Sequence, residues 1–315
     1  MALRIGSDTT LDAVAVRKTF GTTAAVDDLT FEARAGEVVG FLGPNGAGKT
    51  TAIRVLTTIL APSAGRFAVA GIPDSRPSEI RRRVGVLPES AGYPERQTGE
   101  EFLRYHARLF GHTRPSARAV AAARLEEVGL SERGSSAIGV YSRGMRQRLG
   151  IARALLNEPA VAFFDEPTLG LDPAGQRQVL ELVVGIARTR GATVVLSTHF
   201  LDEVEEACSR VLILNRGRLV ADGTVAEIVR RAAAPQRARA RVPAELRGRA
   251  TQVLEQVAVV TDAQLDWLGL SLPADGARGM NDALRALVDA QIPVLGFEIE
   301  GARLSDAFLA MTEDG

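Results

Sequence analysis

A glycine-rich segment near the start of the chain has the residue types and spacing of a phosphate-binding loop. It consists of Gly43-Pro44-Asn45-Gly46-Ala47-Gly48-Lys49-Thr50, which matches the pattern G-x-x-x-x-G-K-[ST] at every position. Glycines let backbone N–H groups turn inward around phosphates, and the start of the following helix adds positive potential. We expect Lys49 to neutralise the terminal phosphates and the Thr50 hydroxyl to ligate Mg²⁺. The segment, with Thr51 after it, predicts a nucleoside triphosphate site.

Two adjacent carboxylates follow an apolar segment that predicts a buried strand. Asp165 and Glu166 come directly after residues 160–164, at the edge of a sheet where a phosphate loop would also lie. There Asp165 would hold Mg²⁺ through water, and Glu166 would polarise the attacking water as a general base. The alternative is an acidic pair on the surface, and the phosphate loop favours the catalytic interpretation.

His199 follows a second apolar segment, residues 194–198, and should emerge at the same edge of the sheet. In that position it could contact the γ-phosphate, as a polar positioning group rather than as a base. His106 and His112 lie in a helical region and are interpreted as ordinary, partly exposed histidines.

The adenine base is favoured over guanine. Most GTPases use Asn-Lys-x-Asp to bind guanine, and both lysines of this chain, Lys18 and Lys49, lie outside such a pattern. Phe20 could stack on adenine and contribute about 1 kcal/mol. It could equally be a core residue of a strand.

The elements that must position these residues follow from the apolar periodicity. Alternation in residues 11–35 predicts antiparallel strands, and residues 38–42, the loop and residues 50–60 predict strand, turn and helix. Residues 77–157 predict a helical insertion with Phe102, Tyr105, Leu109 and Phe110 on one stripe. Strands at 161–164 and 194–197 flank a helix at 174–190, which indicates a parallel sheet, and a hairpin at 211–221 closes the domain.

A second domain is predicted after residue 230. Residues 231–236 form the expected linker of an arginine-rich segment, and residues 237–315 have the element order β-α-β-β-α-β of a ferredoxin-like unit. The expected strands are 237–242, 257–260, 267–272 and 294–299, and the expected helices are 244–254 and 280–290. The arginine-rich segment lacks interleaved aromatic residues, which favours a solvated surface over a nucleic-acid site.

Composition narrows the class of protein. The 315 residues are 46% hydrophobic, which suits a globular fold, and 38 basic residues balance 38 acidic ones, so no nucleic-acid partner is expected. Cys208 is the single cysteine, which excludes disulfide frameworks and cysteine-based metal sites. No apolar run reaches the roughly 18 residues of a spanning helix. We therefore expect a cytosolic location.

The motifs in their order resemble the nucleotide-binding domain of ABC transporters over residues 11–229. They are the phosphate loop, Tyr141-Ser142-Arg143-Gly144-Met145, Asp165-Glu166, Leu171-Asp172 and Ser197-Thr198-His199. The resemblance implies an α/β P-loop ATPase domain over residues 1–230, with a mixed sheet, an antiparallel β subdomain and a helical subdomain. It also implies a head-to-tail homodimer in which Ser142 and Gly144 act on the partner's ATP and Asp172 communicates across the interface.

Two positions depart from the family pattern. The signature, usually Leu-Ser-Gly-Gly-Gln, has Arg143 in place of its first glycine, and this side chain would either add charge toward the partner's phosphate or point to solvent. Leu87-Pro88-Glu89 has Glu where the family commonly has a Gln that contacts Mg²⁺ and the attacking water. Glu89 can still ligate a hard cation through oxygen, with an added negative charge.

These departures, with the tail at residues 303–312, are similar to the drug-export subfamily typified by daunorubicin-resistance pumps. That likeness implies a separate integral membrane permease, a peripheral position on the cytoplasmic face of the membrane, and ATP-driven efflux of a small hydrophobic compound such as a drug or antibiotic. The C-terminal domain would stabilise or regulate the dimer, or be purely structural. One alternative is a soluble ABC ATPase acting on nucleic acid or ribosomes, and another is a P-loop small-molecule kinase.

Overall fold

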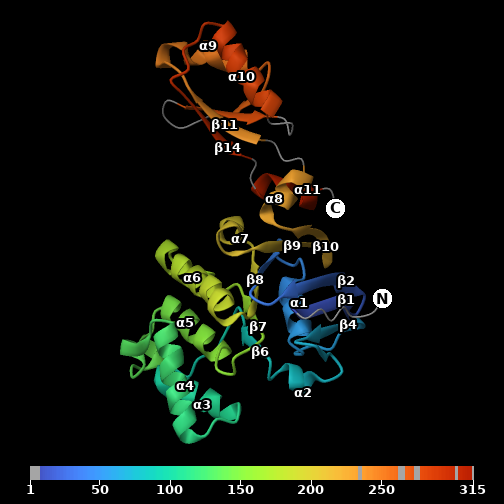
Figure 1. The fold of residues 1–315 in the computed structure, drawn as a ribbon, viewed down its shortest axis with the longest axis vertical. Helices are drawn as coiled ribbons and strands as arrows, with labels where there is room; N and C mark the ends of the chain where they lie inside the picture. Colours follow the sequence, from blue (N-terminus) through green and yellow to red (C-terminus); the bar gives the residue numbers. More distant parts are fainter. Residues whose placement is uncertain (1–7, 233–235, 262–266, 273–276, 302–303, 314–315) are drawn as a thin grey trace. The chain divides into compact units, whose positions relative to one another are not determined.

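The chain divides into two compact units in the computed structural model, Met1–Thr224 and Val225–Gly315 (Figure 1). The structure describes residues 8–232, 236–261, 267–272, 277–301 and 304–313. Helix α8 (Val225–Arg231) belongs to the second unit, whereas the sequence analysis places residues 225–230 in the first domain. Residues 233–235 of the predicted linker lie outside the described residues.

A six-stranded, mostly parallel sheet forms the centre of the first unit, with the strand order β10-β9-β3-β8-β7-β6. Its strands are β3 (Val38–Leu42), β6 (Val84–Leu87), β7 (Val161–Asp165), β8 (Thr193–Thr198), β9 (Arg210–Asn215) and β10 (Arg218–Gly223). The last two form the predicted hairpin and pair antiparallel, while all other neighbours pair parallel. Every residue of β3 and β7 is buried, as expected for strands covered on both faces.

Two hydrophobic clusters cover the two faces of this sheet. Phe163 points into the cluster formed with helix α1 (Lys49–Leu56) and a second, antiparallel sheet, whereas its neighbour Phe164 points into the cluster formed with the helical insertion. This alternation is the period-two geometry of a strand. The antiparallel sheet has the order β2-β1-β4-β5 and contains β1 (Thr9–Phe20), β2 (Thr23–Arg34), β4 (Ala64–Val69) and β5 (Ile72–Pro73).

Helices α3 (Gly99–Leu109), α4 (Arg114–Glu127), α5 (Arg143–Ala154) and α6 (Pro173–Arg190) lie on one side of the six-stranded sheet, whereas α2 (Pro77–Ile80) lies on the side of α1 (Figure 1). The first unit also contains α7 (Leu201–Ala207) and two 3₁₀ turns, η1 (Ser131–Arg133) and η2 (Ile138–Val140). Helix α3 starts with a capping box, in which Thr98 and Glu101 bond each other's backbone N–H. Helices α4, α5 and α6 each begin at a residue whose side chain caps the first turn.

Several predicted elements differ from those observed. The helix predicted at 50–60 ends at Leu56, because the Thr57 hydroxyl bonds the Ile53 carbonyl and Thr58 adopts a left-handed φ of 61°. The predicted helical insertion at 77–157 also contains the edge strand β6, which follows the short helix α2. The predicted stripe in α3 is wrong beyond Phe102, because Tyr105 is 58% exposed. Strands β4 and β5 and helix α7 were not predicted.

An antiparallel sheet with the order β12-β13-β11-β14 organises the second unit. Its elements are β11 (Gln236–Arg241), η3 (Ala244–Leu246), α9 (Arg247–Leu254), β12 (Val259–Thr261), β13 (Trp267–Leu272), α10 (Ala277–Asp289), β14 (Gly296–Gly301) and α11 (Leu304–Glu313). Ala238 and Ala240 of β11 are buried under the helices, while Arg239 and Arg241 lie on the opposite face against the Trp267 ring. The arginines therefore occupy the exposed face of β11, and the alanines that alternate with them occupy its buried face.

No helix in the described part of the chain is both long enough and apolar enough to cross a membrane.

Candidate nucleotide-binding site

The glycine-rich loop connects the buried strand β3 to helix α1, as its motif requires. Gly48 has a φ of 101°, and a Cβ added there would overlap the backbone oxygen of Ala25. A Cβ on Gly43 would likewise overlap the carbonyl oxygen of Leu214. Both positions therefore need glycine, Gly43 because other backbone atoms approach so closely, and Gly48 for that reason and for its left-handed backbone.

The N-terminus of α1 has none of its usual protein partners. Gly48 is its N-cap and offers no side chain to the first N–H groups, and the first turn contains no acidic residue. The positive end of the helix dipole is therefore not neutralised by this helix itself. Such an end can receive a phosphate from the loop side.

Lys49 lies at this helix start and is only 6% exposed. Its Nζ donates to the carbonyl oxygens of Gly43 at 2.7 Å and Pro44 at 3.3 Å, and lies 3.7 Å from Glu166 Oε1. Burial lowers the pKa of Lys49, and the nearby carboxylates of Glu166, Asp165 and Glu89 oppose that shift. The cation is therefore held inside the loop, paired mainly with one carboxylate.

Asp165 ends strand β7 beside Ser197 of β8, its neighbour in the parallel register. Asp165 Oδ1 accepts hydrogen bonds from Ser197 Oγ at 2.8 Å and from Thr50 Oγ1 at 3.1 Å. The side chain is buried, and Thr50 belongs to the first turn of α1. One carboxylate oxygen thus joins the end of the central sheet to the helix after the phosphate loop.

Glu166 and His199 face each other across the ends of the same two strands. His199 Nδ1 lies 2.9 Å from Glu166 Oε2, and the Glu166 side chain is only 8% exposed against 32% for His199. Glu166 has a φ of 50°, a left-handed backbone that is rare for a side chain of this size, and its N–H donates to the Ser197 carbonyl at 3.0 Å. The strand end is thus turned so that the carboxylate meets both Lys49 and His199.

A cavity of about 380 Å³ opens over these groups. The predicted residues that line it are Asn45, Gly46, Ala47, Gly48, Lys49, Thr50, Thr51, Glu89, Glu166 and His199. Asp165 lies behind Thr50, through the hydrogen bond described above. Ala25 and Leu169 also line the cavity and were missed, because an alanine on a strand and a leucine in a loop have no chemical signature in sequence.

Six further predicted residues do not line this cavity. Gly43 and Pro44 bond Lys49 through their carbonyl oxygens, and Phe20, Ser142, Gly144 and Asp172 lie elsewhere. Phe20 is 52% exposed at the end of β1, with Lys18 Nζ 5.3 Å from the ring centroid. Ser142 is the exposed N-cap of α5, where its Oγ accepts the Met145 N–H at 3.2 Å, and Gly144 follows in the first turn. Asp172 caps α6 in the same way, accepting the Gly175 N–H at 3.2 Å.

The oxygen donors at the cavity suit a hard divalent cation. Among the described residues, no three His, Cys, Asp or Glu side chains cluster as a complete metal site. Mg²⁺ in nucleotide sites rarely has such a cluster, since it keeps several waters and takes one or two carboxylates together with phosphate oxygens. Thr50, Asp165 and Glu89 fit that requirement as a partial set of ligands.

Comparisons with known proteins agree with this geometry. The family model described as "ABC transporter" matches residues 26–169. The doxorubicin resistance ATP-binding protein DrrA of Mycobacterium tuberculosis is 35% identical over 308 residues, covering 95% of this chain and 92% of the relative. The Streptomyces peucetius daunorubicin/doxorubicin resistance ATP-binding protein DrrA is 36% identical, covering 94% and 90%. The Nod factor export ATP-binding protein I of Burkholderia thailandensis is 41% identical, covering 68% and 70%.

Solved structures share the fold of the first unit. An ATP-binding subunit of an ABC transporter has a TM-score of 0.63 at 33% identity, covering 71% of this chain and 93% of its own. The Clostridium perfringens protein cbiO1, part of the ABC transporter complex cbiONQ, has a TM-score of 0.64 at 26% identity, covering 71% and 94%.

Proposed function

We propose that this chain, which belongs to the ABC transporter family, is the ATP-binding and ATP-hydrolysing subunit of an exporter whose membrane permease is a separate chain. The observation that carries the proposal is the contact of the buried Lys49 and Glu166 with each other and with the partly exposed His199, at the mouth of a glycine-rich loop. A plain structural turn does not need a buried lysine paired with a glutamate whose backbone is left-handed.

Each group of this contact set has a role in ATP hydrolysis. The loop amides and Lys49 bind the phosphates and stabilise the charge that develops on the transferred group. Glu166 accepts a proton from the attacking water, for which its burial and its position at the cavity suit it. His199 holds the Glu166 carboxylate through Nδ1 and presents the other edge of its ring toward the γ-phosphate.

Thr50, Asp165 and Glu89 hold Mg²⁺ in this proposal. When bound, the ion neutralises phosphate charge and orients the terminal phosphate. The hydrogen bond from Thr50 to Asp165 keeps these two oxygens together at the cavity. Glu89 follows the edge strand β6, the neighbour of β7, and adds a carboxylate to the same cavity.

The active unit is a homodimer. Ser142, Gly144 and Asp172 lie outside the cavity of their own chain and are exposed or half-buried at the starts of α5 and α6. Residues in that position can act on the ATP of a second copy, with Ser142 and Gly144 binding its phosphates and Asp172 contacting the facing chain. The ATP-binding cassette MJ0796, which shares the fold of the first unit, has been solved as a dimer bound to ADP and Pi.

Export of a small hydrophobic compound, such as a drug or antibiotic, follows from relatives that are named for drug resistance and Nod factor export. The chain would lie on the cytoplasmic face of the membrane, bound to an integral permease. Residues 1–224 form the ATPase domain of this proposal, and residues 225–315 form an accessory unit that stabilises or regulates the dimer.

Glu166→Gln tests the catalytic assignment. The amide keeps the shape but cannot accept the proton, so the hydrolysis rate should fall by about 10²–10⁴-fold while ATP binding persists. Steady-state phosphate release and binding of a fluorescent ATP analogue measure the two effects. Glu255→Gln, an exposed charge removal in the second unit, is the control. A normal rate of ATP hydrolysis in Glu166→Gln would contradict the general-base assignment.

Purification from membranes tests the transport assignment separately. Mild detergent extraction should recover the chain with a strongly apolar integral partner, and hydrophobic compounds should stimulate the ATPase of that complex. Recovery with ribosomes or nucleic acid instead would favour a soluble ABC ATPase.

A further inference from the structure

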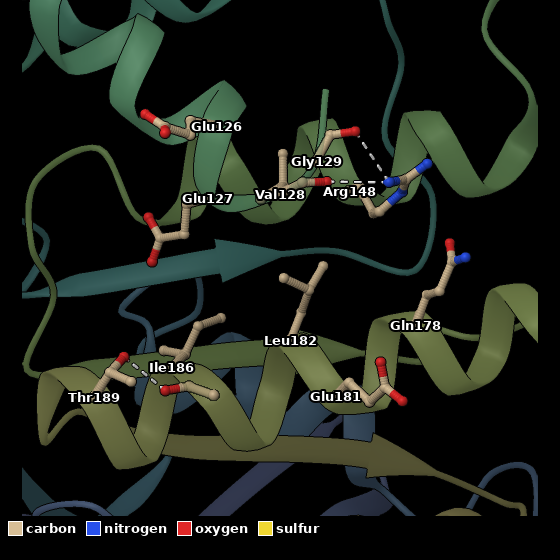
Figure 2. Close-up of a pocket in the computed structure, with 11 residues that line it drawn as sticks. Glu126, Glu127, Val128, Gly129, Arg148, Gln178, Glu181, Leu182, Ile186 and Thr189 are labelled. Atoms are coloured by element: carbon tan, nitrogen blue, oxygen red, sulfur yellow. Dashed lines mark hydrogen bonds between the residues drawn. The ribbon is translucent and has the colours of Figure 1, made fainter. Parts of the chain in front are cut away.

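A second cavity of about 450 Å³ lies between α4, α5 and α6 and shares no lining residue with the nucleotide cavity. Figure 2 shows Leu182 and Ile186 of α6 facing Val128, at the end of α4, across this space. Val128 and Ile186 are each 2% exposed, so the floor is apolar and well packed. The volume falls in the range of about 300–1,000 Å³ that is usual for small-molecule sites.

The ionisable lining of the cavity is mainly acidic. Three carboxylates line it, from Glu126, Glu127 and Glu181, against one guanidinium, from Arg148. Glu127 is already neutralised, because Arg190 donates to its two oxygens at 2.7 and 2.8 Å. The carboxylates of Glu126 and Glu181 are exposed at the rim of the cavity and make no hydrogen bond or ion pair with any described residue.

The single guanidinium of the cavity is occupied by the backbone. Arg148 donates from one nitrogen to the carbonyl oxygens of Val128 at 3.1 Å and Gly129 at 3.3 Å, where α4 ends (Figure 2). This is the usual way in which a basic side chain caps the C-terminus of a helix. Arg148 therefore balances the dipole of α4 rather than the carboxylates at the other edge.

One face of α6 lines the cavity and contains Gly185, where no neighbouring atom excludes a larger side chain. Gln178, Glu181, Leu182, Gly185, Ile186 and Thr189 all line the space. A Cβ added to Gly185 would meet nothing within 4 Å, and its backbone is helical. Glycine inside a helix costs about 1 kcal/mol relative to alanine. What the missing side chain provides here is room above the helix.

We propose that this cavity binds a small organic cation with an aromatic or aliphatic body. The body lies over Leu182, Gly185 and Ile186, and the ammonium group pairs with Glu181, with the Gln178 amide oxygen as a second acceptor. An anion is repelled by the exposed carboxylates at the rim, and a neutral molecule gains no Coulombic attraction from them.

A ligand in this cavity would change the rate of ATP hydrolysis, a consequence that rests on the proposed function. Helix α5 begins at Ser142 and α6 at Asp172, and the cavity lies between these two helices. A ligand wedged there changes the spacing of the two helices. It therefore changes how the two N-terminal residues meet a second copy.

A fluorescence titration of the full chain with 2-naphthylmethylamine tests binding directly. Saturable one-site binding is expected, at least tenfold tighter than that of the neutral isostere 2-naphthylmethanol. Glu181→Gln should weaken amine binding about tenfold and leave alcohol binding unchanged, whereas Glu255→Gln should change neither. Equal affinity for amine and alcohol, or no saturable binding, overturns the proposal.

Gly185→Leu localises the site. A Cβ at this position meets nothing within 4 Å, so the leucine side chain should extend into the cavity and the probe should no longer bind, while the melting temperature stays equal or rises. Undiminished binding in this variant places the probe elsewhere and overturns the proposal, as does loss of an oligomer in this variant, which would make the cavity a protein interface. ATPase activity that responds to the amine in the unmodified chain but not in Gly185→Leu supports the link to hydrolysis. Amine binding without any ATPase response refutes that link alone, and leaves both the site and the ATPase function standing.

Discussion

The helices α1 and α5 begin at the two sites to which we assign ATP contacts, and their N-termini are built in opposite ways. The start of α1 has no side-chain cap, and a buried lysine follows the N-cap Gly48. The start of α5 is capped by its own Ser142, which is exposed. The N–H groups at the start of α1 are therefore available to a phosphate bound by this chain alone. At the start of α5 the Ser142 side chain already caps the first turn, and Ser142 is exposed to a second molecule.

The glycines at the two helix starts, Gly48 and Gly144, differ in the same way. The loop glycine Gly48 is fixed by its own chain, because the Ala25 backbone leaves no room for a Cβ. At Gly144 the nearest atom to an added Cβ is Leu171 Cδ2, at the ordinary contact distance of 3.9 Å. If Gly144 is required, the requirement comes from a second molecule. The comparison thus separates a site completed within one chain from a site that needs two.

Among substitutions at the two helix starts, Lys49→Ala should have the largest effect, because it removes the lysine that is held inside the α1 site. Hydrolysis is expected to fall on the order of 10²–10³-fold, the usual loss for one charge-stabilising donor, and ATP binding should weaken with it. Phosphate release and nucleotide titration measure both. Lys18→Ala is the matched control, since Lys18 is the other lysine of the chain and bonds the Ala61 carbonyl at an exposed position. A Lys49→Ala variant with half the normal activity would contradict the assignment.

The next largest effects come from alanine at the two glycines. Gly48→Ala should lower the free energy of unfolding by more than about 1 kcal/mol, because a left-handed residue gains a clashing Cβ, and ATP binding should weaken. Gly144→Ala should leave the free energy of unfolding unchanged or raise it by up to about 1 kcal/mol, yet reduce hydrolysis. Urea unfolding and ATPase assays on both variants separate the two cases. Full activity in Gly144→Ala would remove the argument for a second molecule at α5.

Ser142 has a structural role and a proposed role in binding, and two substitutions separate them. Ser142→Ala removes the cap and should cost about 1 kcal/mol of stability together with activity. Ser142→Asp restores a capping oxygen and hence stability, but places a carboxylate where the partner's phosphate would bind, so activity should stay low. Recovery of both stability and hydrolysis in Ser142→Asp would mean that Ser142 is a cap and nothing more.

The parts of the site that sequence could predict are those with a chemical reason in one segment. The glycine-rich loop, Asp165-Glu166 and His199 each follow an apolar strand, and parallel strands end at one edge of the sheet, so their convergence could be predicted. The position of Ser142 as an N-cap was predictable from its type and the helix after it. These inferences need only the order of strands and helices.

The parts that failed depend on contacts between distant segments. Ala25 lines the cavity because β2 passes over the loop, and no property of alanine signals that. Tyr105 shares the helical period of Phe102, but period alone does not say which side of α3 meets the core. Strand β6 is too short for its period to be distinguished from that of a helix, and its assignment depends on pairing with β7.

Glu89→Gln should have the smallest effect, and it tests how far the α1 site depends on charge beyond its own loop. Glu89 is exposed at the cavity, where its carboxylate opposes the binding of phosphate at the positive end of α1. Removing one exposed charge near a helix N-terminus changes the free energy by about 0.3–1 kcal/mol, or up to about fivefold in affinity. ATP without Mg²⁺ should therefore bind more tightly to Glu89→Gln at low salt, and the gain should shrink at high salt because ions screen exposed charges.

With Mg²⁺ present the gain in ATP affinity should be smaller still or reversed, because the same carboxylate is then a proposed ligand of the ion. Titrations of ATP at two salt concentrations, with and without Mg²⁺, distinguish the two roles, and an affinity that ignores both salt and metal would show that Glu89 takes no part in the site.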